Sequence, residues 1–159
     1  MRALLLLLVA ATAVHPASLK VLRADQAAAI APEVGAGNVV VVHYWAQWCG
    51  ACLKEWPRLA PALKELGRDV RVATVSLDPK AKASELPAVL ARFGAGGWPA
   101  YLLDAPEPDP VVAAIDKTWD GSLPATFVYD RQGRRVASLI GTTDLHLLRA
   151  AVAQAEAAK

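Results

Sequence analysis

The chain has 159 residues, a length that suits a single domain with a sizeable hydrophobic core. Its 17 Lys and Arg and 15 Asp and Glu give a net charge of +2, and these charges are dispersed without a basic block. The composition therefore excludes an electrostatic surface for nucleic acid.

The N-terminal segment has the pattern of a signal peptide. Arg2 supplies a positive start, an apolar core follows from Ala3 to Ala11, and small residues suited to cleavage come next. The apolar run is shorter than the roughly 20 residues that a membrane-spanning helix needs. We expect cleavage near residues 13 to 17, export to the periplasm and one mature domain over 18–159. An uncleaved membrane anchor is the alternative.

The first half of the chain alternates between predicted strands and helices. In order, these are a short edge strand at 19–22, a helical turn at 25–30, a strand at 39–45, a helix at 50–66 and a strand at 70–77. The run at 39–45 is continuous and β-branched, which is typical of a strand buried on both faces. We expect Pro57 to kink the helix and Gly67 to end it.

The second half continues this alternation and closes with a hairpin. The predicted elements are a helix at 84–93, a strand at 100–103, a short helix within 111–119, strands at 125–129 and 135–140, and a helix from Thr143 or Asp144 to about 155. Residues 106–110 include three prolines and are expected to be irregular. Because helices fall where parallel crossovers need them, the order predicts an α/β domain.

The residues with the clearest chemistry lie at the start of the helix at 50–66. Cys49 and Cys52 are the only cysteines, and they form a C-x-x-C pair just after a buried strand. At a helix N-terminus, unpaired N–H groups and the helix dipole favour the Cys49 thiolate, which is the nucleophile of disulfide exchange. Cys52 lies one turn further in, close enough to close a disulfide and too near the core to be attacked first.

Two other interpretations of the cysteine pair are weaker. A zinc site needs two more ligands, but the histidines, His15, His43 and His146, are scattered without ligand spacing. A purely structural disulfide would add little stability, because closing so short a loop removes little chain entropy. The pair therefore favours redox chemistry, with no metal and no cofactor.

Two motifs together resemble the exported TlpA/ResA-type thiol–disulfide oxidoreductases. They are Cys49-x-x-Cys52-x-x-Glu55-x-Pro57 and Leu123-Pro124-Ala125-Thr126-Phe127-Val128-Tyr129-Asp130-x-x-Gly133. The resemblance covers roughly residues 35–156. It implies a thioredoxin-like α/β fold, in which helices flank a central mixed sheet and an extra helix and strand lie between the C-x-x-C helix and the proline hairpin.

The resemblance also assigns roles to single residues. Pro124 matches the cis-proline of the family, which would leave the Leu123 backbone free to pair with an extended client; otherwise it would be an ordinary trans proline. Glu55 matches a glutamate that handles the proton of Cys52; an exposed glutamate paired with Lys or Arg is the alternative. The expected client-binding surface comprises Trp48, Gly50, Ala51 and Leu123.

His43 departs from the family pattern. The matching position, six residues before the first cysteine, holds an aspartate in thioredoxins and an amide or another neutral residue in many TlpA/ResA-type chains. A histidine there is either a base near neutral pH or a neutral, hydrogen-bonded core residue without a catalytic role. The second interpretation is slightly favoured, and His43 stays a candidate site residue.

The direction of electron flow is expected to be reductive. Gly50 and Ala51, between the cysteines, lack a cation that would strongly stabilise the thiolate, whereas strong oxidants stabilise their reduced form. The resemblance implies disulfide-bearing clients such as apocytochromes c or copper-site proteins, and a membrane thiol donor that re-reduces the pair. We expect a monomer. The alternatives to a reductase are an exported oxidase or isomerase and a copper(I) carrier. The carrier is less favoured because relatives that deliver copper usually space their cysteines by three residues.

Overall fold

The computed structural model describes residues 19–35, 37–105 and 108–158; the expected signal peptide at 1–17 lies outside the described residues. In the described part of the chain, six strands form one sheet in the order β1-β4-β3-β2-β5-β6. Strands β1, β4, β3 and β2 pair in parallel, whereas β5 runs antiparallel to both β2 and β6, so the predicted mixed sheet is confirmed. The strands are β1 (Leu19–Arg23), β2 (Val39–Trp45), β3 (Val70–Ser76), β4 (Ala100–Asp104), β5 (Ala125–Tyr129) and β6 (Arg135–Ile140).

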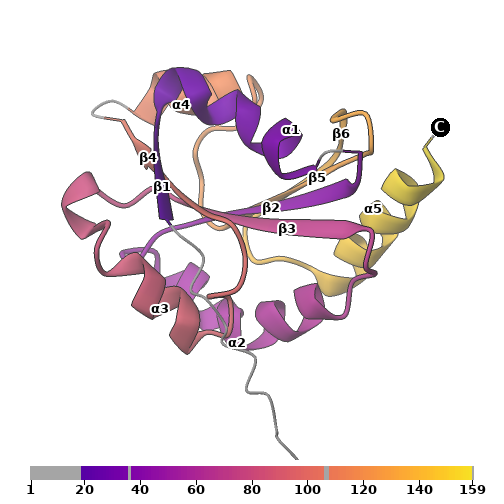
Figure 1. The fold of residues 1–159 in the computed structure, drawn as a ribbon, viewed down its shortest axis with the longest axis horizontal. Helices are drawn as coiled ribbons and strands as arrows, with labels where there is room; N and C mark the ends of the chain where they lie inside the picture. The colour runs from indigo at the N-terminus through magenta and orange to yellow at the C-terminus, as the bar shows by residue number, and fades with distance from the viewer. Residues whose placement is uncertain (1–18, 36, 106–107, 159) are drawn as a thin grey trace, which may run out of the picture.

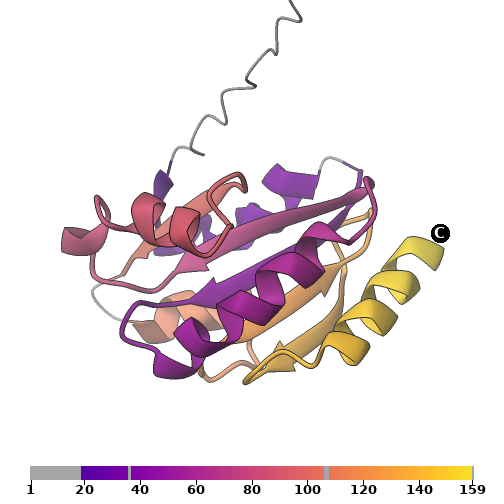
Figure 2. The ribbon, with the colours of Figure 1, turned by 90° about the horizontal axis from the view of Figure 1, so that it is seen from below.

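Helices cover both faces of this sheet (Figure 1, Figure 2). One face carries α1 (Ile30–Gly35) and α4 (Pro108–Ile115), and the other carries α2 (Gly50–Lys64), α3 (Leu86–Arg92) and α5 (Leu145–Ala157). Short 3-10 helices occupy Ala24–Ala29 and Lys80–Lys82. Between α2 and the β5–β6 hairpin the chain adds α3 and β4, the helix and strand expected there. No helix in the described ranges has the length and apolar character needed to cross a membrane.

Strand β2 is the centre of the domain, and all seven of its residues are buried. Because side chains alternate along a strand, Val40, Val42 and Tyr44 enter the core beneath α1 and α4. The alternate residues, Val39 and Val41, pack with residues of α2 and α5. His43 shares this second face, so the strand period places an imidazole directly against the helix that follows the cysteines.

Helix α2 begins immediately after Cys49, which is its N-cap residue. The helix runs through Pro57 and Pro61 to Lys64, two residues short of the predicted end. It buries one face, which includes Cys52, Glu55, Trp56 and Leu59. The position of Cys49 at the helix N-terminus, expected because helix-permissive residues follow the buried strand, is confirmed.

The expectation of an irregular segment at 106–110 is wrong for the part that the structure describes. Helix α4 begins at Pro108 and includes Pro110 in its first turn. Prolines are tolerated there because the first N–H groups of a helix have no partner within the helix, and the fixed φ of proline suits helical geometry. The helix predicted within 111–119 therefore starts earlier and ends at Ile115.

The last helix, α5, is capped by Asp144, one of the two predicted caps. Its Oδ1 accepts hydrogen bonds from the N–H groups of His146 at 2.7 Å and Leu147 at 3.1 Å. These bonds satisfy orphan donors of the first turn. Since Asp144 caps the helix, the neighbouring Thr143 is left for another role.

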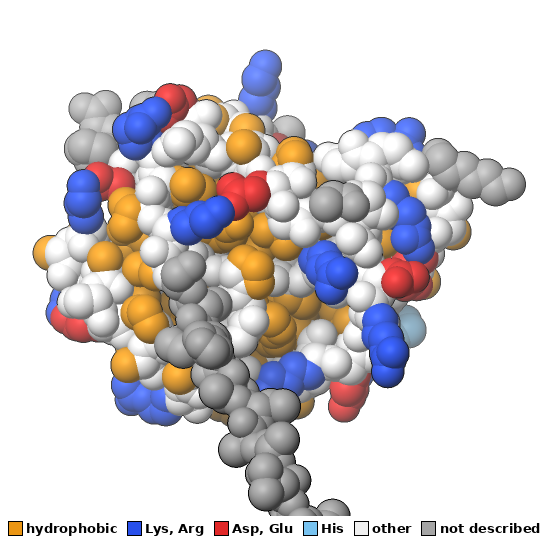
Figure 3. Space-filling view, in the orientation of Figure 1, with side chains coloured by type: hydrophobic (Ala, Val, Ile, Leu, Met, Phe, Trp, Pro, Cys, Tyr) orange, Lys and Arg blue, Asp and Glu red, His pale blue; other side chains and the backbone are white. Residues whose placement is uncertain are grey.

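Charges on the surface are mixed. On the face seen in Figure 3, Lys and Arg side chains are scattered and lie among Asp and Glu side chains rather than in one patch. This view agrees with the dispersed charges of the sequence, which give a net charge of only +2.

Candidate active site

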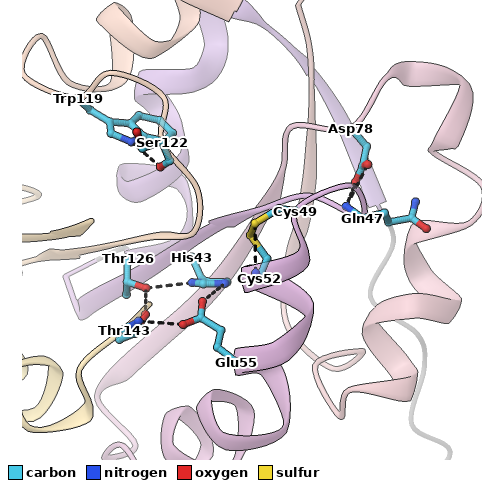
Figure 4. Close-up of a disulfide and its surroundings, with 10 residues drawn as sticks. All are labelled: His43, Gln47, Cys49, Cys52, Glu55, Asp78, Trp119, Ser122, Thr126 and Thr143. Atoms are coloured by element: carbon cyan, nitrogen blue, oxygen red, sulfur yellow. Dashed lines mark hydrogen bonds and ion pairs between the residues drawn. A yellow bond between two sulfur atoms is a disulfide. The ribbon is translucent and has the colours of Figure 1, made fainter. Parts of the chain in front are cut away.

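The two cysteines form a disulfide at the N-terminus of α2 (Figure 4). Cys49 Sγ accepts the backbone N–H of Cys52 at 3.1 Å. Cys49 is 7% exposed and Cys52 is fully buried, so an incoming partner can reach only the first sulfur. In the reduced state the same N–H and the helix dipole favour a thiolate on Cys49.

A buried carboxylate fixes the loop that leads into the motif. Both oxygens of Asp78 accept the N–H of Gln47, at 3.1 and 3.0 Å, and Oδ2 also accepts the hydroxyl of Ser76 at 2.8 Å. Asp78 lies just beyond the end of β3, beside the loop that joins β2 to Cys49 (Figure 4). Sequence reasoning missed Asp78, although an aspartate two residues after a buried strand was the available signal.

The peptide bond between Leu123 and Pro124 is cis, as the family resemblance implied. Pro124 is buried, and its carbonyl accepts the N–H of Gly141 at 2.8 Å. Leu123 packs against the hydrophobic cluster that contains both cysteines. The structure therefore brings the proline loop to the disulfide, although 70 residues separate them along the chain.

The expected client-binding residues near the disulfide differ in how exposed they are to solvent. Trp48 is 65% exposed, and Gly50 and Ala51 are exposed as well. Leu123 is only half-buried. A depression of about 650 Å³ begins at Trp48 and extends to Asp120 and Gly121 in the loop before Leu123. Its floor is largely apolar and includes Leu77, Leu103 and Val112.

Glu55 is 3% exposed, which rules out the alternative of an exposed glutamate. Its Oε2 accepts the backbone N–H of Thr143 at 2.8 Å, and its Oε1 lies 3.3 Å from His43 Nε2. Burial raises the pKa of Glu55, while the hydrogen bond from Thr143 and the charge of Arg58 oppose that rise. Arg58 itself donates to the carbonyl of Thr143 at 2.8 Å.

His43 is fully buried, and its ring meets the ring of Trp56 edge-on with centroids 4.8 Å apart. Its Nδ1 lies 2.9 Å from Thr126 Oγ1, which lies 2.8 Å from Thr143 Oγ1. Burial lowers the pKa of His43 from 6.5 to about 3, so the imidazole is neutral near pH 7. The geometry favours the hydrogen-bonded neutral residue over a cation. The sequence offered no signal for Thr126 and Thr143, because buried threonines are common in strands and loops.

A second depression, of about 340 Å³, opens beside Glu55. It is lined by Gly50, Ala51, Lys54, Glu55, Arg58 and Thr142. Glu55 therefore borders a space open to water, although its own exposed area is small. Within the described ranges, no three His, Cys, Asp or Glu side chains are arranged to hold a metal ion.

Sequence comparisons place this site in a known family. The thioredoxin family model matches residues 23–99, which include both cysteines. The chain is 33% identical over 89 residues to the thioredoxin of Rhodospirillum rubrum, covering 56% of this chain and 74% of that protein. It is 34% identical over 67 residues to protein disulfide isomerase-like 2-1 of Oryza sativa subsp. japonica, covering 42% of this chain but only 17% of that longer protein.

Solved structures share the fold at lower identity. A thiol-disulfide isomerase from Corynebacterium glutamicum superposes with a TM-score of 0.66 and 19% identity, covering 80% of this chain and 86% of that one. A secreted Mycobacterium tuberculosis disulfide oxidoreductase, described as homologous to Escherichia coli DsbE, gives a TM-score of 0.55 and 19% identity, with 76% and 84% covered. The chain belongs to the thioredoxin family, and its C-x-x-C disulfide is that of a thiol–disulfide oxidoreductase.

Proposed function

We propose that the chain is an exported reductase of TlpA/ResA type, which reduces disulfides of client proteins through Cys49 and Cys52. The observation that carries this proposal is a buried disulfide at a helix N-terminus, with a buried Glu55 one turn below Cys52. Export is supported by the apolar N-terminal pattern and by the secreted protein among the structural neighbours. Reduction is supported by the small, uncharged Gly50-Ala51 dipeptide.

The proposed cycle starts from the reduced dithiol. The Cys49 thiolate attacks a client disulfide, which forms a mixed disulfide and releases one client thiolate. Cys52 gives its proton to the carboxylate of Glu55 and attacks Cys49 Sγ. The second client sulfur leaves and takes up a proton, while Cys49 and Cys52 end as the disulfide. Two electrons thus pass to the client. A membrane thiol donor then supplies two electrons to the Cys49–Cys52 disulfide by the same kind of exchange, which restores the dithiol.

Client recognition is assigned to the surface around Cys49. Trp48 offers a large exposed ring beside the nucleophile, and the neighbouring apolar depression can accept side chains of an extended client segment. Leu123 packs against the hydrophobic cluster that contains both cysteines, and we assign its backbone to pair with that segment. Apocytochromes c and copper-site proteins are the client classes that the family resemblance implies.

The reduction potential of the cysteine pair tests the direction of the reaction. Titration in redox buffers can be followed by tryptophan fluorescence, because Trp45 and Trp56 pack in the same cluster as the disulfide. A potential near that of thioredoxin, about −270 mV, is the expected result. A potential near about −120 mV would make the protein an oxidase and overturn the proposal. The Cys52→Ser variant, which cannot close the disulfide, serves as the control without a two-electron transition.

A further inference from the structure

Behind the cysteine pair, four buried residues from different parts of the chain close into a ring of polar contacts. His43 lies on β2, Glu55 on α2, Thr126 on β5, and Thr143 directly before the cap of α5. Each is at most 3% exposed. The ring closes because Thr143 takes part twice, through its hydroxyl toward Thr126 and through its backbone N–H toward Glu55 (Figure 4).

The contact between His43 and Glu55 completes this ring. Among the described residues, neither His43 Nε2 nor Glu55 Oε1 has a hydrogen-bond partner, and the two atoms face each other at 3.3 Å. Buried polar atoms without a partner are costly, so one of these two atoms must carry a proton for the other to accept. The position of this proton, on His43 or on Glu55, determines which group donates in each of the other side-chain hydrogen bonds of the ring.

Two complete hydrogen-bonding patterns are possible. When Glu55 is a carboxylate, His43 Nε2–H donates to Oε1, the Thr126 hydroxyl donates to Nδ1, and the Thr143 hydroxyl donates to Thr126. When Glu55 is a carboxylic acid, its O–H donates to Nε2, Nδ1–H donates to Thr126, and the Thr126 hydroxyl turns to Thr143. Both patterns keep the N–H of Thr143 donating to Oε2 and leave the imidazole neutral.

We propose that His43 is a positioning residue which changes tautomer, from Nε2–H to Nδ1–H, whenever Glu55 gains a proton. The proton balance is simple: Glu55 gains one proton, and the imidazole moves its own proton from Nε2 to Nδ1. No buried imidazolium forms, in agreement with the strongly lowered pKa of His43. The inference rests on the proposed function only for the source of the proton, which is Cys52.

Other charged groups near the ring do not take the place of Glu55 as the partner of His43. On α2, Arg58 is bound to the carbonyl of Thr143, and Lys54 lines the open depression beside Glu55. Asp144, at the start of α5, interacts with Arg58. From β3, the residue paired with His43 is the neutral Thr74. Cys49 and Cys52 do not titrate in the oxidised protein, because they are joined in the disulfide.

The test uses the oxidised full chain labelled with ¹⁵N in histidine and ¹³C in the glutamate carboxyl groups. NMR spectra from pH 5 to 9 report the protonation of both His43 nitrogens and of Glu55 together, and the His43→Asn variant identifies the His43 signals. We expect the Nδ1–H tautomer to replace the Nε2–H tautomer with the same midpoint as the Glu55 carboxyl. An imidazolium signal, or a tautomer that stays constant while Glu55 titrates, would overturn the proposal.

The Glu55→Gln variant provides a second measurement that does not depend on pH. The amide oxygen must face the fixed N–H of Thr143, so its NH₂ group faces His43 Nε2. We expect His43 in this variant to be Nδ1–H throughout the range from pH 5 to 9, whereas the matched Glu156→Gln variant on the exposed side of α5 leaves the titration unchanged. An Nε2–H tautomer in Glu55→Gln would overturn the proposal. Turnover of a small disulfide, measured on the same samples, tests the proposed reductase function separately.

Discussion

The backbone N–H of Thr143 donates to Oε2 of Glu55 at 2.8 Å, across 88 positions of the sequence. Because Asp144 caps α5 itself, this N–H is left for the site rather than for the helix. The turn between the β5–β6 hairpin and the last helix thereby holds the carboxyl group beneath the cysteines. Changes at this turn are therefore expected to alter proton transfer as well as stability.

Glu55→Gln is expected to slow client reduction and to stabilise the fold at alkaline pH. The reaction loses its proton acceptor, for which a loss of about 100-fold is expected in the rate of resolving the mixed disulfide. Burial raises the pKa of Glu55 in the folded state, so its contribution to stability is present at low pH and declines as pH rises through the folded pKa. Stopped-flow kinetics and denaturant unfolding at pH 5 and 8 test both effects. From pH 5 to pH 8, the free energy of unfolding of the wild type should fall relative to that of Glu55→Gln. The absence of such a fall would contradict this account.

His43→Asn is expected to weaken the acid sensitivity of the fold. The pKa of His43 is lowered from 6.5 to about 3 in the folded state, so the unfolded chain binds an additional proton between these values. The contribution of His43 to stability is therefore complete above about pH 6.5 and is lost as pH falls toward about 3, by a few kcal/mol in all. The variant should have a lower free energy of unfolding than the wild type at pH 7, but its free energy of unfolding should fall less between pH 7 and pH 4. Urea unfolding across this range measures the difference in slope.

Asp78→Ala is expected to release the loop before Cys49. The N–H of Gln47 would lose its acceptor, which is expected to reduce the free energy of unfolding by about 1–3 kcal/mol. Thermal unfolding measures this loss, and the reduction potential shows whether the cysteine pair is affected as well. Asp69→Ala, at a side chain that is 72% exposed, is the matched control and should have little effect.

Trp48→Ala is expected to impair client reduction without destabilising the fold. The side chain is largely exposed, so the free energy of unfolding should change by no more than about 0.5 kcal/mol. Removal of a large aromatic contact should reduce kcat/KM for a protein client by about 10-fold. A small synthetic disulfide, which does not reach the ring, serves as the comparison substrate. Equal losses for both substrates would show that Trp48 acts on the cysteines rather than on the client.

Cys52→Ser is expected to accumulate the mixed disulfide between Cys49 and a client. The second cysteine is fully buried, so the client meets Cys49 first and cannot be released without Cys52. Non-reducing electrophoresis detects the adduct as a band that disappears on reduction. The Cys49→Ser variant is the control, and an adduct of equal yield through Cys52 would contradict the assigned order of attack.

Much of the fold was predictable from local patterns. The β-branched run of β2, the hairpin turn before β6 and the C-x-x-C pair each follow from residues close together in sequence. The start of α4 was mispredicted because prolines usually break helices, whereas in a first turn they are compatible with one. The cis bond at Pro124 was expected from family resemblance, not from physics alone.

The acid–base surroundings of the cysteines were only partly predictable. The sequence indicated His43 and Glu55 separately, but nothing local indicated that the two side chains meet at 3.3 Å. Their contact depends on the face of β2 that α2 covers, and the threonines join them from β5 and from the turn before α5. Contacts across such sequence distances arise from tertiary packing, which local propensities do not encode.

The closed ring also constrains how this protein can diverge from its relatives. An aspartate in place of His43, as in thioredoxins, would set two carboxyl groups against each other in a buried site, where one must remain protonated. It would also leave the Thr126 hydroxyl without the nitrogen that it now contacts. Positions 43, 55, 126 and 143 are therefore expected to covary in an alignment of homologues, with histidine at 43 accompanied by hydroxyl residues at 126 and 143.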